Sequence, residues 1–167
     1  MSVTVRRLTP DDIPALREAR LEGLRNHPEA FSADLSVWEA LTPEVWRTRV
    51  MSGNWFGAFS GDALAGICAI STSYSLKTSH IGEFGAMYVR AGYRGQHVGD
   101  ALIDAVIEFA RPKFELVTLT VIAENTHAIA LYERHGFVVN GKMPRAIRIG
   151  DRYYDELHMV RDLEGTP

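Results

Sequence analysis

The stretch Tyr93–Leu102, YRGQHVGDAL, most constrains how this chain can fold. Gly95 and Gly99 frame a short polar loop that joins an expected strand to an apolar helix. Such a loop places free backbone N–H groups at a helix N-terminus, where the helix dipole adds roughly half a positive charge. Arg94 adds a planar donor fork that suits a diphosphate. The stretch therefore indicates an anion-binding turn, with a plain strand–helix turn as the alternative.

The segments around this loop predict a mixed α/β chain. The expected strands are 2–7, 54–60, 64–73, about 80–89, 114–123, 137–149 and 152–160, and the expected helices are 10 to about 26, a short one from 43, 100–110 and 125–135. Most of the segment between residues 27 and 42 has no clear assignment. This order predicts one domain over residues 1–167, with helices on both faces of a mixed sheet.

Composition excludes several classes of protein. The 167 residues, 46% apolar and 23% charged, are typical of one soluble globular domain. The formal net charge of −3 argues against nucleic acid as a partner, because neutralising phosphates needs a basic face. No run approaches the roughly 18 apolar residues of a membrane span, and the start lacks the apolar core of a signal peptide. Cys68, the single cysteine, cannot form an internal disulfide. We therefore expect a cytoplasmic protein without a membrane partner.

Common cofactor motifs are absent from the sequence. There is no Gly-Lys-Ser/Thr of a P-loop and no Gly-x-Gly-x-x-Gly dinucleotide fingerprint. The histidines other than His97 show no His-x-x-x-His or similar spacing, so no metal site is expected. Cys68 lies in the apolar segment LAGICAI and is expected to be a core residue rather than a nucleophile.

A second pattern lies at Val121–Phe137, VIAENTHAIALYERHGF, where an expected strand runs into a helix. Tyr132 follows Asn125 by seven positions, so both side chains can point to the same side of the helix start. A purely structural interpretation makes Asn125 the N-cap and Tyr132 a core anchor. It explains each residue but not their combination with the glycine loop.

Together these motifs resemble the GNAT superfamily of acetyl-CoA-dependent N-acetyltransferases. YRGQHVGDAL resembles its pyrophosphate loop, Arg/Gln-x-x-Gly-x-Gly/Ala, and ENTHAIALYERHGF resembles its signature Asn-x-x-Ala-x-x-Leu-Tyr-x-x-x-Gly-Phe. HPEAFSADLSVWE is similar to a Pro-Glu-Ala-Phe segment that many members carry between their first two helices. The resemblance covers nearly the whole chain. It implies a central twisted mixed sheet of about seven strands flanked by about four helices.

The resemblance also implies where acetyl-CoA, the co-substrate, would bind. The strand before the loop would pair with the pantetheine arm, and the amides of the loop would meet the pyrophosphate. Asn125 would hydrogen-bond the pantetheine or the substrate, while Tyr132 would face the thioester sulfur. The implied cofactor-binding residues are Met87, Tyr88, Val89, Arg94, Gly95, Gln96, His97, Val98, Gly99, Asp100, Asn125, Ala128 and Tyr132.

The implied reaction is a direct transfer, in which a neutral amine attacks the acetyl carbonyl and the thiolate leaves. An alkyl amine with a pKa of about 10.4 is protonated at neutral pH, so a base is needed. Glu83 is the candidate base, and Tyr132 is the candidate acid for the departing sulfur. Strand alternation predicts Glu83, Gly85, Met87 and Val89 on one face, with Gly85 leaving room for substrate. A cross-sheet ion pair of Glu83 with Arg145 or Arg148 is the alternative.

His97 departs from the family loop, whose middle residue is glycine. Glycine there permits positive φ and close approach of phosphate. We expect His97 to keep a negative φ and the loop to bind normally. A distorted pocket with lower affinity is the other outcome.

The acceptor side is less defined. Aromatic residues of the first helices and the last hairpin would flank an amine, although such residues are more often core. The candidates are Phe31, Ser32, Trp38, Tyr74, Glu83 and Tyr154 (or its neighbour Tyr153). Asp155 and Glu156 would attract a cationic acceptor, with exposed charges at the sheet edge as the alternative. A small amine, an amino acid, an antibiotic and a protein N-terminus all stay open. The final hairpin has enough apolar surface to pair two copies into a homodimer.

Two other functions stay open. One is a catalytically weak or inactive acyl-CoA-binding or regulatory module of the same fold, which the substitution at His97 motivates. The other is a phosphonucleotide-binding protein.

Overall fold

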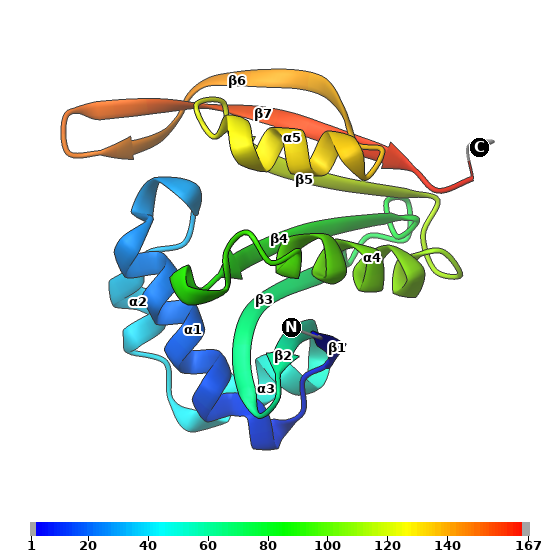
Figure 1. The fold of residues 1–167 in the computed structure, drawn as a ribbon. Coiled ribbons are helices and arrows are strands. Elements are labelled where there is room, and N and C mark those ends of the chain that lie inside the picture. The colour runs from blue at the N-terminus through cyan, green and yellow to red at the C-terminus, as the bar shows by residue number, and fades with distance from the viewer. Residues whose placement is uncertain (1–2, 165–167) are drawn as a thin grey trace.

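A computed structural model describes residues 3–164, which form a seven-stranded sheet with helices on both faces (Figure 1). The strands are β1 (Thr4–Arg7), β2 (Asn54–Ser60), β3 (Ala63–Thr72), β4 (Ile81–Val89), β5 (Leu116–Ile122), β6 (Val138–Ile149) and β7 (Arg152–Asp162). The helices are α1 (Ile13–Asn26), α2 (Leu35–Glu39), α3 (Pro43–Ser52), α4 (Val98–Ala110) and α5 (Thr126–Arg134), with 3-10 turns η1 (Pro10–Asp12), η2 (Pro28–Ala30) and η3 (Ala91–Tyr93). Each expected strand and helix is present, with ends that differ by a few residues, and residue 2 of the first expected strand lies outside the described residues. The addition is α2, which is too short to give a helical period.

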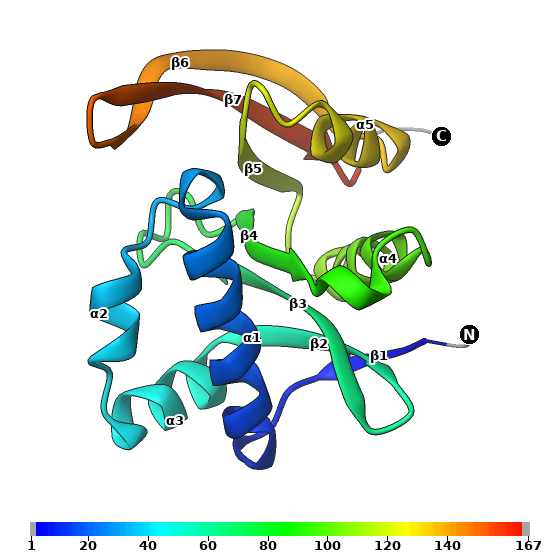
Figure 2. The ribbon, with the colours of Figure 1, turned by 60° about the vertical axis from the view of Figure 1, so that its left-hand side comes forward.

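The sheet order β1-β2-β3-β4-β5-β7-β6 contains one parallel junction, between β4 and β5. The parallel pairing is short and ends at Glu83 with Thr118. Beyond that pair the two strands separate, and Figure 2 shows the two parts of the sheet diverging. The remaining length of β4 therefore has no strand partner on this side within residues 3–164, and its backbone polar groups are open to a ligand.

Two apolar cores hold the sheet, one on each face. On one face α4 and α5 bury Leu102, Val106 and Tyr132 against the strands. On the other, α1, α2 and α3 form a second core, which contains Leu16 and Trp46. The helices on opposite faces leave the diverging ends of β4 and β5 between them (Figure 1).

A β-bulge in β4 overturns one expectation. Tyr88 pairs with Ile67 and Gly85 with Ala69, so two residues of β4 lie opposite the single residue Cys68. One of the two, Ala86, has a φ of +53°. The extra residue breaks the alternation of side chains between the two faces of the sheet.

The bulge sorts the side chains of β4 differently from the prediction. Phe84, before the bulge, packs in the α4 core, so its neighbours Glu83 and Gly85 point to the α1 face. Met87, the second bulge residue, and Val89, beyond the bulge, pack on the α4 core instead. The prediction that Glu83, Gly85, Met87 and Val89 share one face is therefore wrong, because a bulge leaves no period in the sequence.

Candidate functional site

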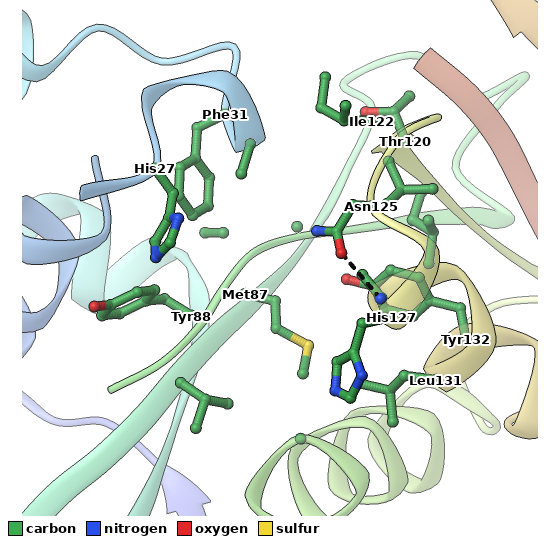
Figure 3. Close-up of a pocket in the computed structure, with 18 of the residues that line it drawn as sticks. His27, Phe31, Met87, Tyr88, Thr120, Ile122, Asn125, His127, Leu131 and Tyr132 are labelled. Atoms are coloured by element: carbon green, nitrogen blue, oxygen red, sulfur yellow. Dashed lines mark hydrogen bonds between the residues drawn. The ribbon is translucent and has the colours of Figure 1, made fainter. Parts of the chain in front are cut away.

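A cavity of about 890 Å³ opens where β4 and β5 separate (Figure 3). Its α4–α5 wall comes from residues between 84 and 100 and between 119 and 134, and its α1–η2 wall from Arg20 and residues between 27 and 33. Strand β7 also contributes lining residues. The expected site residues that line it are Phe31, Ser32, Met87, Tyr88, Val89, Arg94, Gly95, His97, Val98, Gly99, Asp100, Asn125, Ala128, Tyr132 and Tyr154.

Tyr153 and Asp155 do not line this cavity, and neither do the candidates Trp38, Tyr74, Gln96 and Glu83. Trp38 is buried, with edge-on contacts to Trp46 and Trp55. Tyr74 is fully exposed in the β3–β4 connection. The Gln96 side chain turns back to donate to a loop carbonyl. Glu83 is exposed at the branch point of the sheet. These placements give Trp38 a core role and leave Glu83 one residue from the lining residue Phe84.

Free amides gather at the α4 end of the cavity. In the described chain, the backbone N–H groups of Gly95, Gln96 and His97 have no backbone acceptor. The first N–H groups of α4 lack intrahelical acceptors by geometry and point the same way. Gly95 has a φ of +73°, which a residue with a Cβ would adopt only with strain. This end can therefore bind an anion through main-chain donors, as the sequence predicts.

The expectation of a negative φ at His97 is wrong. Its φ is +59°, the left-handed conformation that the family glycine would take, and its carbonyl accepts from Ala101 N at 3.0 Å to start α4. Histidine is among the side chains that tolerate this region. Its exposed imidazole Nδ1 lies 3.3 Å from Asp100 Oδ2. The loop keeps its shape without the glycine.

The guanidinium of Arg94 hydrogen-bonds to other groups of the protein. Its Nε donates to the Val89 carbonyl at 3.1 Å, and its Nη2 donates to His27 Nε2 at 2.9 Å. The side chain therefore ties the loop to the end of α1. This contact differs from the diphosphate role that the sequence suggests for the guanidinium, and it leaves the main-chain amides as the donors available to an anion.

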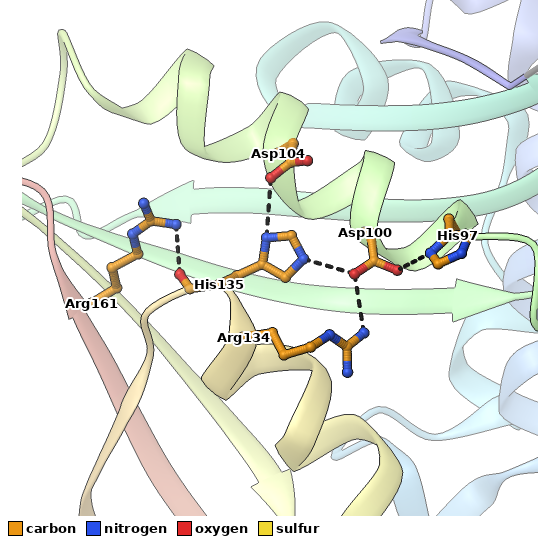
Figure 4. A network of polar contacts seen from close by, with 6 residues as sticks. All are labelled: His97, Asp100, Asp104, Arg134, His135 and Arg161. Carbon is orange, nitrogen blue, oxygen red and sulfur yellow. Dashed lines mark hydrogen bonds and ion pairs between the residues drawn. The ribbon is translucent and has the colours of Figure 1, made fainter.

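A network of charged contacts joins α4 to the end of α5 at the wall of the cavity (Figure 4). Asp100 Oδ1 lies 3.0 Å from both Arg134 Nη2 and His135 Nε2. On its other ring nitrogen, His135 Nδ1 lies 3.0 Å from Asp104 Oδ1. Burial raises the pKa of Asp100, but hydrogen bonds from His135, Arg134 and His97 outweigh burial and lower it below its ordinary value. The carboxylate at the anion end is thus neutralised by its neighbours.

Asn125 and Tyr132 mark the middle of the cavity. Asn125 Oδ1 accepts from Ala128 N at 3.1 Å, which confirms the N-cap, and its amide nitrogen points into the cavity (Figure 3). Tyr132 is 8% exposed and packs edge-on against Phe84 and Phe137. Burial, followed by the nearby Cys68, raises the pKa of Tyr132. The phenol therefore stays protonated at neutral pH and can donate a proton.

Sequence reasoning missed Arg20, a buried cation on the α1–η2 wall. The signal was present, because Arg20 lies four residues from both Leu16 and Leu24 and so shares their apolar face. Glu156 of β7, expected only as a charge that attracts a cationic acceptor, also lines the cavity. A helix that buries an arginine among leucines needs a reason beyond packing.

Two kinds of site are not seen among residues 3–164. No group of three or more His, Cys, Asp or Glu side chains is placed to hold a metal ion. No helix in this range is both long and apolar enough to cross a membrane. Cys68 is fully buried, and burial raises the pKa of its thiol, so its expected place in the core is confirmed.

Comparisons with known proteins agree with this geometry. Residues 16–137 match the Acetyltransferase (GNAT) family. The chain is 25% identical to the L-amino acid N-acetyltransferase AaaT of Escherichia coli over 166 residues, 95% of this chain and 97% of that protein. A GNAT-family acetyltransferase from Streptococcus pneumoniae has the same fold (TM-score 0.85, 24% identity, 96% of this chain and 99% of that one). So does a phosphinothricin acetyltransferase from Sinorhizobium meliloti in complex with AcCoA (TM-score 0.84, 18% identity, 97% and 89%). Since the family match spans most of the chain, including the glycine loop and the α5 signature, this protein belongs to the GNAT family and is an acetyltransferase.

Proposed function

We propose that the protein transfers the acetyl group of acetyl-CoA directly to the primary amine of a small acceptor, an amino acid in the first instance. The observation that carries the proposal is one continuous cavity. It joins the free amides before α4 to Tyr132, along the unpaired edge of β4, and continues to the α1–η2 wall.

The residues fit acetyl-CoA. The amides at 95–97 and the start of α4 suit a pyrophosphate, and the open backbone edge of β4 suits the amide groups of an extended pantetheine arm. The Sinorhizobium meliloti acetyltransferase of the same fold is in complex with AcCoA, which supports this choice. Acetyl-CoA supplies the activated thioester; the chain's own groups bind, orient and move protons.

Tyr132 is the proposed general acid. It lines the cavity where β4 and β5 have separated, and burial keeps its hydroxyl protonated. Donation of that proton to the leaving thiolate would prevent the sulfur from attacking the new amide. Asn125, with its Oδ1 engaged at the helix start, offers its amide N–H groups to a carbonyl in the cavity.

Glu83 stays the proposed general base, acting through a water molecule because its side chain does not line the cavity. It makes no ion pair with Arg145 or Arg148, the alternative partners: those arginines contact other groups, such as the carboxylate of Asp151 beside Arg148. Glu156 lines the cavity directly and is the carboxylate to test against it.

Purified protein should release CoA thiol from acetyl-CoA in the presence of an amine panel. The panel contains amino acids, simple amines, an aminoglycoside and a peptide with a free N-terminus, and mass spectrometry identifies the acetylated product. Binding of CoA with no turnover on any amine would support an acyl-CoA-binding module instead. Stabilisation against heat by ATP but not by CoA would point to a nucleotide-binding protein.

Assembly and location stay predictions. A homodimer through β6 and β7 is favoured by their exposed apolar side chains, such as Val138 and Tyr153. Sedimentation at micromolar concentration measures it, and a monomer would contradict it. A cytoplasmic location follows only from the sequence arguments, and cell fractionation tests it.

A further inference from the structure

Arg20 is a buried arginine to which the proposed steps of acetyl transfer give no role. Its side chain lies on α1 and the residue is 5% exposed. The guanidinium stacks on two aromatic rings, 4.8 Å from the centre of Phe31 and 4.5 Å from that of Trp38. Its Nε and Nη1 are covered by protein and have no hydrogen-bond partner. Buried donors without partners are rare, because each costs the desolvation of a polar group.

The charge of Arg20 is also uncompensated. Among the described residues no carboxylate forms an ion pair with it, and the charged side chain that acts on its pKa is a second cation. That neighbour, Arg49, stacks on Trp38 as well, at 4.7 Å. Burial and then Arg49 lower the pKa of Arg20 to about 10, so the side chain is still a cation at neutral pH. A buried, unpaired cation is a strongly unfavourable arrangement unless an anion joins it.

The position of Arg20 indicates that such an anion would reach it through the cavity. Arg20 lines the cavity, and the ring of Phe31 that stacks on it faces Asn125 and Tyr132 across the open space (Figure 3). Nη2 is not among the covered nitrogens. An anion that enters the cavity can therefore reach the guanidinium at Nη2, while the two rings hold its plane in place.

We propose that Arg20 binds the carboxylate of the acceptor and so selects α-amino acids over simple amines. The proposal rests on the proposed acetyl transfer and names its substrate class. In this arrangement the carboxylate lies against Arg20 on the α1–η2 wall, and the α-amine is directed across the cavity toward Tyr132. Arg20 is a specificity residue that touches the acceptor, and residues of the other wall would hold the acetyl group and its thioester.

The test compares acceptors that differ by one group. Leucine, methionine and phenylalanine are each paired with the amine that lacks the carboxylate, and kcat/KM is measured for both members. We expect wild-type protein to prefer the amino acid. Arg20→Met should reduce that preference by about 30-fold or more. Arg20→Lys, which keeps the charge and loses the planar fork, should fall between them. Arg17→Met, on the exposed side of the same helix, is the matched control and should keep the preference.

Several outcomes overturn the proposal. If Arg20→Met lowers kcat/KM equally for both members of a pair, the arginine has a structural role only. A wild-type enzyme that does not distinguish the members also refutes it. If no amine is acetylated, the proposed function fails rather than the carboxylate site, and calorimetry with leucine then decides. Binding to wild type that is weakened or lost in Arg20→Met supports the site, and equal or absent binding in both overturns it. Circular dichroism verifies that each variant is folded.

Discussion

The two walls of the cavity treat charge in opposite ways. On the α4–α5 wall, Asp100 is surrounded by Arg134, His135 and His97, so a partly buried carboxylate is fully paired. On the α1–η2 wall, Arg20 is buried more deeply and has no anionic partner in the described part of the chain. A paired charge holds helices together, whereas an unpaired one is stabilised only when a ligand supplies the missing charge. The difference fits an α4–α5 wall that would bind the same co-substrate in every reaction and an α1–η2 wall that would select the acceptor.

The largest expected effect is on the α4–α5 wall, at Tyr132. Tyr132→Phe removes the proton donor and keeps the ring that packs on Phe84 and Phe137. We expect kcat to fall about 100-fold with a much smaller change in the KM of acetyl-CoA, and with the same preference among acceptors. Steady-state kinetics with two acceptors measure all three. A changed preference among acceptors would mean that the α4–α5 wall also contributes to the choice of acceptor.

The second expected effect concerns the base. Glu83→Gln should lower kcat/KM about 10-fold and flatten the acidic limb of its pH profile, because the carboxylate that accepts the proton is gone. Glu156→Gln, on the cavity lining, is the matched comparison and should leave the limb in place. The reverse result, a limb lost in Glu156→Gln and kept in Glu83→Gln, would assign the base to β7.

A smaller effect is expected from breaking the paired wall. Because the folded-state pKa of Asp100 lies below its ordinary value of 3.8, its ionised form stabilises the fold at neutral pH. That stabilisation decreases as the pH falls through the ordinary value and is lost below the folded-state pKa. Asp100→Asn should cost about 1 kcal/mol at neutral pH and nothing in strong acid. Urea unfolding of both proteins at two pH values measures it, and a difference that does not depend on pH would contradict it.

The smallest expected effect is at His97, on the edge of the same network. His97→Gly removes the strain of a side chain on a left-handed backbone, which favours the folded state. Glycine also gives the unfolded chain more conformational freedom, and the exposed contact of the imidazole with Asp100 is lost, so both of these effects favour unfolding. The free energy of unfolding should change by less than about 1 kcal/mol, and the KM of acetyl-CoA by less than about threefold. Thermal unfolding and kinetics measure these. A large rise in KM would show that the imidazole contacts the cofactor.

The α4–α5 wall could be predicted from the sequence because its parts are local. The free amides come from one loop, and Asn125 and Tyr132 lie within one helix and its cap, so each motif carries its own geometry. Main-chain donors also tolerate changes of side chain, which is why His97 fits where the family has glycine. The resemblance to a known family adds the ligand that these local motifs cannot name.

The α1–η2 wall could not be predicted because distant residues build it. Arg20 meets Phe31 and Trp38 only after α1, η2 and α2 fold together, and an arginine in a helix is usually exposed. The bulge at Ala86 is invisible to an alternating pattern, and it turned the predicted face of Glu83 away from that of Met87. Aromatic residues gave false candidates in the same region, since Trp38 serves the core and Tyr74 is exposed.

The brevity of the β4–β5 junction has a mechanical consequence. The parallel pairing runs only from Ile81 with Leu116 to Glu83 with Thr118. The sheet therefore consists of two parts, β1–β4 and β5–β7, that are joined by one short strand pairing. The ion pairs of His135 with Asp100 and Asp104 join the two parts on the α4 side, and η2 contacts β5 and β6 on the other side. An extended ligand that pairs with β4 would take the place of a strand between the two parts of the sheet. The two parts would then unfold as one cooperative unit. Amide hydrogen exchange should then slow across β4 and β5 together when CoA binds, well beyond the residues that touch it.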